Sequence, residues 1–216
     1  MGDEPLDDPD AAVPVIFVPE VRDYVRINAE LVALLDEGHP RIRLESAEGQ
    51  RLLASGLVGP WDAVVEVGGR TGPELAANLD APRLRIIARG GTLDGPGRGL
   101  RAGLIVILGD AGDGVGYAQS GGLLVVTGNA AHRAGLAQSG GTLAVLGSTG
   151  RLAGDRQSGG FFFLGPGGLG PHPGRAWRGG RRVGWTDSLG PLEQTEWTSL
   201  VGAISPWVDP SLLIRR

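Results

Sequence analysis

Apolar and polar positions repeat along the middle of the chain with a period of 19 residues. The repeat is plainest in three segments that align without gaps: GVGYAQSGGLLVVTG from Gly114, RAGLAQSGGTLAVLG from Arg133 and LAGDRQSGGFFFLGP from Leu152. Each segment holds one apolar run of about five residues, which is strand length and too short for a helix. A period of this size without a helix predicts coils of strands and turns that stack through parallel ladders.

Two columns of the repeat are apolar in every coil and identify the inward face. Because side chains alternate between the two faces of a strand, positions two residues apart share a face. The columns are Ile86, Ile105, Leu124, Leu143 and Phe162, and Ala88, Ile107, Val126, Val145 and Leu164. We therefore expect an all-β fold, a right-handed parallel β-helix built as a single-stranded solenoid of 19-residue coils. A leucine-rich repeat is the rival, but its Leu-x-x-Leu-x-Leu-x-x-Asn pattern is missing.

The alternate columns change character along the chain. One runs Arg85, Leu104, Leu123, Thr142 and Phe161, and the other runs Ile87, Val106, Val125, Ala144 and Phe163. The outer face is thus polar in an early coil and apolar in later ones. Since large exposed apolar patches usually mark interfaces, we expect either the chain's own C-terminal helix or a partner to cover this face. Phe161 and Phe163 are accordingly candidate residues of a partner surface.

A Gln-Ser-Gly-Gly sequence precedes each of the three apolar runs. Its glutamines, Gln119, Gln138 and Gln157, are expected to stack as an amide ladder. Glycines are expected at the corners of the coils, where a Cβ would not be tolerated or φ is positive. The candidate structural turn glycines are Gly116, Gly121, Gly122, Gly135, Gly140, Gly141, Gly154, Gly159 and Gly160.

Short helices are predicted at both ends of the stack. Residues 28–37 (NAELVALLDE) predict a capping helix with Asn28 as its N-cap and Gly38 just beyond its end. Apolar residues at i, i+3, i+4 and i+7 predict an amphipathic helix over residues 191–204.

Further strands are expected between these helices and the regular repeat, at residues 41–44, 63–67 and 181–184. The predicted organisation is an N-terminal tail and capping helix (1–40), the β-helix (41–186), and a C-terminal helix and tail (187–216).

Composition narrows the chemistry. The 39 glycines show no three-residue period, which excludes collagen. A net charge of −4 provides no basic footprint for nucleic acid, and the absence of cysteine excludes disulfides and thiolate sites. No apolar run is long enough to span a membrane, and the acidic start (MGDEPLDDPD) is unlike a signal peptide. We therefore expect a cytoplasmic protein without nucleic-acid or membrane contacts.

Motifs for catalysis and cofactor binding are missing from the sequence. The serines of the Gln-Ser-Gly-Gly turns lack the glycine two residues earlier that a nucleophile elbow needs. The three histidines show no paired metal-ligand spacing. Residues 165–170 spell G-x-G-x-x-G, but Pro-His-Pro follows where the dinucleotide motif needs a helix. We predict no catalytic, cofactor-binding or metal-binding residue, and no cofactor.

Four arginines surround Trp177 near the last coil, namely Arg175, Arg178, Arg181 and Arg182. One interpretation is a solvated basic face with a single anchoring aromatic residue. The other is a contact patch for an acidic partner or a polyanionic ligand. Arg175, Trp177 and Arg178 therefore join Phe161 and Phe163 as candidate partner-surface residues.

The segment GDAGDGVGYAQSGG, from Gly109 to Gly122, resembles the GXGXG domain of glutamate synthase, whose pattern is close to G-D-A-N-D-x-V-G-K-G-x-S-G-G. The next coil, GNAAHRAGLAQSGG from Gly128, resembles the Gly-Asn-Ala-Gly coil of the same family. The resemblance covers roughly residues 42–184. The chain departs from the family at Gly112, where asparagine is common, and it lacks the methionine before the Gly-Gly turn.

The resemblance implies a parallel β-helix without catalytic residues. Such domains occur at the C-terminus of the glutamate synthase large subunit and as stand-alone glutamate-synthase-like subunits. They also form the GXGXG subunit of formylmethanofuran dehydrogenase and that of the related formyltransferase/hydrolase complex. In glutamate synthase the domain supports the spatial relation of the catalytic domains.

We therefore expect a scaffolding subunit of a glutamate-synthase-like oxidoreductase complex, inactive alone and bound to catalytic subunits or to copies of itself. One alternative is the GXGXG subunit of a formylmethanofuran dehydrogenase or formyltransferase/hydrolase complex in one-carbon metabolism. Another is a free-standing interaction module without an enzyme partner. A third alternative is an enzyme in its own right, such as a β-helix esterase or polysaccharide lyase. An acidic cluster on one outer face would favour it, and the strand columns show no such cluster.

Overall fold

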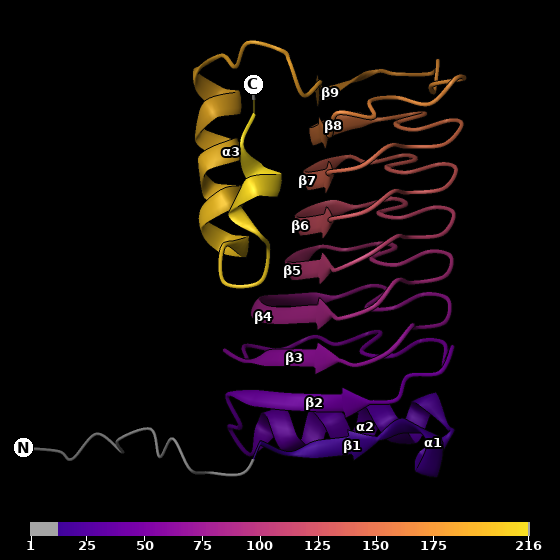
Figure 1. Ribbon diagram of the computed structural model, residues 1–216. Coiled ribbons are helices and arrows are strands. Elements are labelled where there is room, and N and C mark those ends of the chain that lie inside the picture. The colour runs from indigo at the N-terminus through magenta and orange to yellow at the C-terminus, as the bar shows by residue number, and fades with distance from the viewer. Residues whose placement is uncertain (1–12, 216) are drawn as a thin grey trace, which may run out of the picture.

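The computed structural model describes residues 13–215 as a stack of coils, a parallel β-solenoid with helices at the N-terminal end of the stack and another alongside its upper strands (Figure 1). Its nine strands form one sheet whose order follows the sequence, and every neighbouring pair is parallel. The elements are β1 (Val15–Phe17), α1 (Val18–Val21), α2 (Tyr24–Asp36), β2 (Arg41–Glu45), β3 (Val64–Val67), β4 (Asp80–Ala88), β5 (Ala102–Ile107), β6 (Ser120–Val126), β7 (Gly140–Val145), β8 (Ser158–Leu164), β9 (Gly179–Val183), α3 (Pro191–Ile204) and the 3-10 helix η1 (Pro210–Leu213). The predicted N-terminal tail lies outside the described residues up to residue 12.

The register of the sheet confirms the predicted inward columns. Leu124 pairs with Leu143, and Leu143 pairs with Phe162, so these side chains lie above one another inside the coil. The 19-residue step holds from β4 to β8. Towards the ends the coils are longer: the step is 20 residues where Phe162 pairs with Arg182, and 23 residues where Ile42 pairs with Val65.

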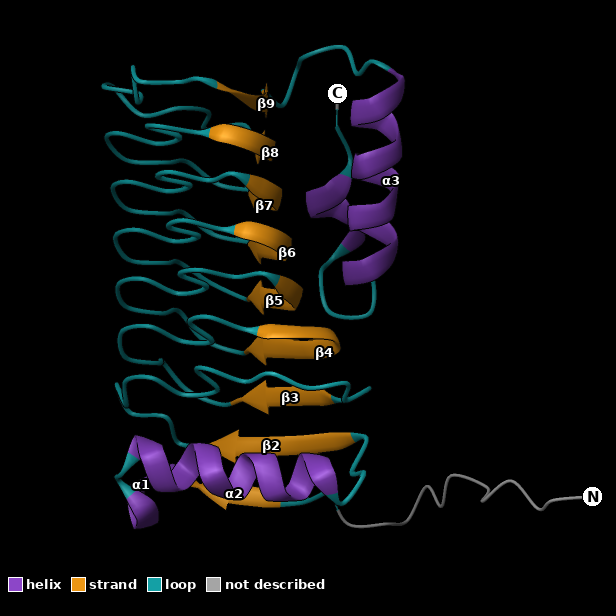
Figure 2. Cartoon of the chain, turned by 180° about the vertical axis from the view of Figure 1, so that it is seen from behind, coloured by secondary structure: helices purple, strands orange, loops and turns teal. Residues whose placement is uncertain are grey.

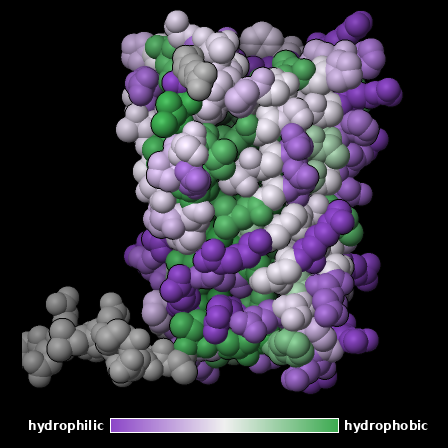
Figure 3. Space-filling view, viewed as in Figure 1, coloured by the Kyte–Doolittle hydropathy of each residue, from purple (hydrophilic) through white to green (hydrophobic). Residues whose placement is uncertain are grey.

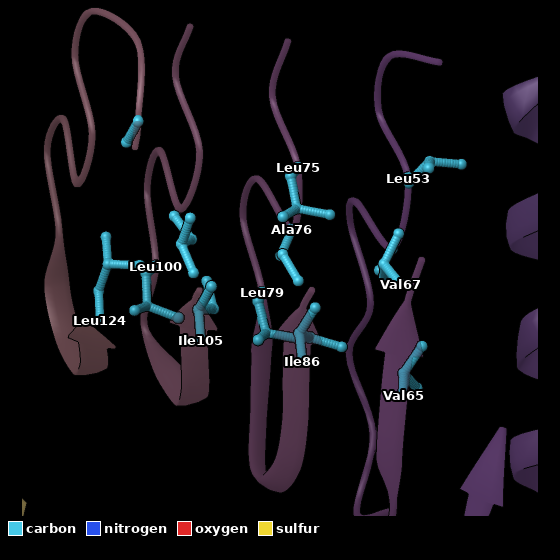
Figure 4. Packing of buried hydrophobic residues seen from close by; sticks show 14 of the residues in the cluster. Leu53, Val65, Val67, Leu75, Ala76, Leu79, Ile86, Leu100, Ile105 and Leu124 are labelled. Carbon is cyan, nitrogen blue, oxygen red and sulfur yellow. The ribbon is translucent and has the colours of Figure 1, made fainter. Parts of the chain in front are cut away.

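The interior of the solenoid is a continuous apolar core. Side chains from the strands meet side chains from the turns on the opposite side of each coil, as Ile86 and Leu79 do in Figure 4. Leu143 and Phe162 are 0% exposed, so the stack leaves no inward position open to solvent in the regular coils.

Helix α2 closes the N-terminal end of this core (Figure 2). Its buried residues are Ile27, Leu31 and Leu35, one stripe of an amphipathic helix. The predicted N-cap was wrong by five residues, because Asp23 is the N-cap and accepts a hydrogen bond from Val25 N at 2.9 Å.

The amide of Asn28 has a different role, inside helix α2. It donates to Leu52 O at 2.8 Å and accepts from Ala54 N at 2.9 Å. Asn28 therefore fastens the capping helix to the next coil instead of starting the helix.

Helix α3 has the bounds that the sequence predicts, and it lies along the outer face of the upper strands (Figure 1). Trp197, Leu200 and Ile204 of α3 join Ile87, Val106, Val125, Ala144 and Phe163 of the sheet in a second apolar core. No helix within residues 13–215 is long and apolar enough to cross a membrane.

Candidate functional site

The Gln-Ser-Gly-Gly turns hold successive coils together. Gln119, Gln138 and Gln157 are 0% exposed. The predicted amide ladder forms in part, because Gln157 Nε2 donates to Gln138 Oε1 at 3.3 Å. Gln138 Nε2 donates instead to Phe161 O at 3.1 Å, and Gln119 Nε2 makes the equivalent bond to Thr142 O at 3.1 Å. Most of the amide bonding thus runs from a glutamine to the backbone of its own and the next coil.

The turn glycines fall into two kinds. At Gly140 an added Cβ would lie 2.2 Å from Ser120 O of the coil below, so no side chain fits there. At Gly135 the φ angle is +64°, a left-handed conformation that L residues adopt at a cost. Close approach alone describes Gly121, Gly140 and Gly159, while positive φ describes Gly116, Gly122, Gly135, Gly141, Gly154 and Gly160. At Gly141 and Gly160 an added Cβ would also lie 2.3 and 2.4 Å from a backbone oxygen.

Sequence reasoning missed that residues other than glycine also take the left-handed conformation. Arg133 and Leu152 both have φ of 61°, and they occupy the column of Gly95 and Gly114, with φ of 70° and 72°. The 19-residue alignment placed these residues in one column and was the signal that could have revealed them. The turns therefore carry backbone strain of about 1 kcal/mol or more at each such residue.

The apolar outer face is covered by the chain itself. Phe163 is 1% exposed, and its ring lies 5.2 Å from that of Trp197 on α3. Thr142, the polar member of its column, donates a hydrogen bond to Glu196 of the same helix. Of the two covers that the sequence allows for this face, the chain's own C-terminal helix therefore lies over Phe163, while Phe161 packs against this second core and is partly exposed.

The C-terminal segment after α3 completes this cover. The Arg215 guanidinium lies over the rings of Trp197, Trp185 and Phe163, at 5.2, 5.6 and 6.0 Å from their centroids. Arg215 Nη2 also donates to Gly184 O at 2.6 Å. Burial lowers the pKa of Arg215, and the Asp187 carboxylate opposes that shift.

The four arginines near Trp177 separate into two groups. Arg175 and Arg178 are exposed beside Trp177, which is 53% exposed. Arg181 faces outward and forms an ion pair with Glu193 at the start of α3. Arg182 continues an inward column, since it pairs with Phe162 in the ladder.

Arg182 closes the inner core at the C-terminal end of the solenoid. Its guanidinium donates to Gln157 Oε1 at 3.1 Å, to Gly174 O at 3.3 Å and to Gly154 O at 2.5 Å. Burial lowers the pKa of Arg182, and the Asp155 carboxylate opposes that shift. A permanently charged side chain that satisfies the last carbonyls thus replaces the apolar residue of the earlier coils.

The lower part of the outer face is charged. Glu66 accepts from Arg41 at 2.7 Å and from Arg89 at 2.8 Å, and it is only 8% exposed. Burial alone would raise the pKa of Glu66, but the two arginines outweigh it and hold that pKa below its usual value. Figure 3 shows hydrophilic side chains over these lower strands, below the region that α3 covers.

An open groove of about 540 Å³ crosses several coils on the turn face, lined by Glu74, Asp94, Asp113, Tyr117 and Arg133 among others. Its carboxylates are used by the fold: Asp94 Oδ1 accepts from Asp113 N at 2.9 Å, and Asp113 Oδ1 accepts from His132 N at 2.9 Å. These side chains tie one turn to the next.

No catalytic constellation is visible in residues 13–215. This part of the chain has no group of three or more His, Cys, Asp or Glu side chains placed to hold a metal ion. Ser120, Ser139 and Ser158 are exposed, and no histidine within residues 13–215 is hydrogen-bonded to any of them. Comparisons with known protein families, curated proteins and solved structures found no match to this chain.

Proposed function

We propose that this chain is a non-catalytic scaffolding subunit of a multi-subunit enzyme, in the manner of the GXGXG domain of glutamate synthase. The observation that carries the proposal is that the segment resembling the GXGXG domain makes contacts between successive coils. In residues 109–122, Gln119 and Gly121 join one coil to the next, and the carboxylate of Asp113 bonds to the backbone of the following turn. Because these residues stabilise the stack of coils, they support a structural role for the chain, as a scaffold for other subunits.

Besides the exposed surface of Arg175, Trp177 and Arg178, two surfaces of the described residues could receive such partners. One is the groove on the turn face, and the other is the charged lower part of the outer face around Glu66. Both combine arginines with carboxylates, so a partner would need complementary charges more than an apolar patch. The resemblance implies a glutamate-synthase-like complex first, and a formylmethanofuran dehydrogenase or formyltransferase/hydrolase complex as the alternative.

A free-standing interaction module is the second candidate, and one observation favours it. The apolar outer face, which would have required a partner, is closed by α3 of the same chain. The chain therefore needs no other protein to bury the apolar outer face of its sheet.

Affinity purification of the full-length chain from its natural source tests the proposal. A stoichiometric partner with amidotransferase, oxidoreductase or formyltransferase activity is expected, while the chain alone gives no turnover of glutamine with 2-oxoglutarate or of formylated pterins. A stoichiometric partner without enzyme activity would favour the free-standing module. Turnover by the chain alone that disappears on substitution of a single serine or histidine would refute both.

A further inference from the structure

The acidic charge of this protein is concentrated in a short stretch at its start. Residues 1–12 contain five carboxylates, at Asp3, Glu4, Asp7, Asp8 and Asp10, and no basic residue. Without these five, the chain has 19 acidic residues against 20 arginines, so the remainder carries a net charge of +1 instead of the −4 of the whole. The N-terminal segment is thus an acidic peptide attached to a nearly neutral body.

The opposite end of the solenoid presents the complementary chemistry. Arg175 and Arg178 are exposed, and within residues 13–215 neither has an ion-pair partner. Between them stands Trp177, 53% exposed, with Arg182 stacked 5.7 Å from its ring centroid. An open pocket of about 630 Å³ adjoins Trp177. The nearby carboxylate of Asp155 is engaged, since it accepts from Ala176 N at 3.1 Å and lies 3.8 Å from Arg156.

Three of the acidic segment's carboxylates, those of Asp7, Asp8 and Asp10, cannot reach this end of their own molecule. The segment precedes β1, whereas Trp177 precedes β9 at the other end of the stack (Figure 1). Eight strand spacings of about 4.8 Å separate β1 from β9, which is about 38 Å. Asp10 lies three residues before Val13, where the described chain begins, and even fully extended it reaches only about 10 Å. Asp3, ten residues away, spans at most about 35 Å.

We propose that the surface of Arg175, Trp177 and Arg178 binds the acidic N-terminal segment of a second copy of this chain, so that solenoids associate head to tail. The contact is one of charge rather than of strand pairing. Within the described residues β9 pairs only with β8, and Arg181 and Arg182 on this edge strand are the kind of residues that discourage strand addition. Because each copy offers one segment and one receiving surface, the association is open-ended. It does not depend on the proposed function, since it needs no other protein.

Sedimentation velocity of the full-length chain over a range of concentrations tests the proposal. At 50 mM NaCl we expect dimers and higher species that grow with concentration, and at 500 mM NaCl an association constant lower by at least about tenfold, because exposed charges are screened. Deletion of residues 1–12, or the double change Arg175→Ser with Arg178→Ser, should each leave a monomer. The matched control is Arg26→Ser with Arg70→Ser, two exposed arginines elsewhere, which should associate like the unaltered chain.

Mixing the two altered chains separates head-to-tail binding from other modes. The deleted chain keeps only the receiving surface, and the Arg175/Arg178 double variant keeps only the acidic segment. Each should be monomeric alone, and a 1:1 mixture should form a dimer and nothing larger. The proposal is overturned if the full-length chain is monomeric at all concentrations in low salt, if the deleted chain still associates, or if the mixture stays monomeric.

Discussion

Trp197 is the residue on which the covering of the outer face depends most. Its indole is 6% exposed and lies between Phe163 and Trp185, with ring centroids 5.2 and 5.8 Å away. A buried aromatic side chain removes about 200 Å² from water, which at about 25 cal/mol per Å² is about 5 kcal/mol. Trp197→Ala should therefore cost about 3–5 kcal/mol, in line with large-to-small changes of this kind.

The loss should fall on the docking of α3 and not on the solenoid, because Trp197 has no part in the inner core. We expect stronger binding of a hydrophobic dye, earlier loss of tryptophan fluorescence in urea, and aggregation, while the far-ultraviolet signal of the strands persists. Leu192→Ala on the same helix is the control, since Leu192 is 59% exposed and its truncation should change stability by less than about 0.5 kcal/mol. If the two variants behave alike, α3 does not cover the apolar outer face of the sheet. A partner protein would then be the expected cover of that face.

Three further changes test the stack, the turns and the charged face. Leu143→Ala should lower the free energy of unfolding by about 3 kcal/mol in urea titrations, because the leucine is 0% exposed between fixed coils, and Leu143→Asp should leave no folded protein. Leu152→Gly should stabilise the chain by up to about 1 kcal/mol and Gly114→Ala should destabilise it by about 1 kcal/mol, since both positions have positive φ. If both changes shift the stability in the same direction, the backbone strain assigned to this column is contradicted. Glu66→Gln should weaken the fold at pH 7. Because the folded pKa of Glu66 is lowered, its stabilising charge is present above about pH 4.3, the usual value in the unfolded chain, and is lost as the pH falls through the folded pKa. The difference in urea midpoint between Glu66→Gln and the unaltered chain should therefore shrink in acid, and a constant difference down to pH 3 would argue against the ion-pair network.

The inner architecture followed from the sequence because a stacked coil imposes the same environment on every nineteenth residue. Leu124, Leu143 and Phe162 had to be apolar together, so their column was visible without any structure. The same regularity revealed the glutamine turns. The repeat could not reveal the hydrogen bonds of these glutamines, because a side-chain amide can donate either to the next amide or to a backbone carbonyl. Gln138 donates to Phe161 O.

Contacts between distant segments were decided only by the tertiary structure. A local pattern suggested Asn28 as an N-cap, but its partners, Leu52 and Ala54, belong to another coil, and the sequence carries no signal for such a pairing. The periodicity of residues 191–204 predicted a helix with one apolar side, and the columns of the sheet predicted a face in need of cover. Whether these two surfaces meet depends on the path of the connecting chain and on the fit of Trp197 against Phe163. Periodicity identifies a surface that must be buried, but it does not identify the surface that buries it.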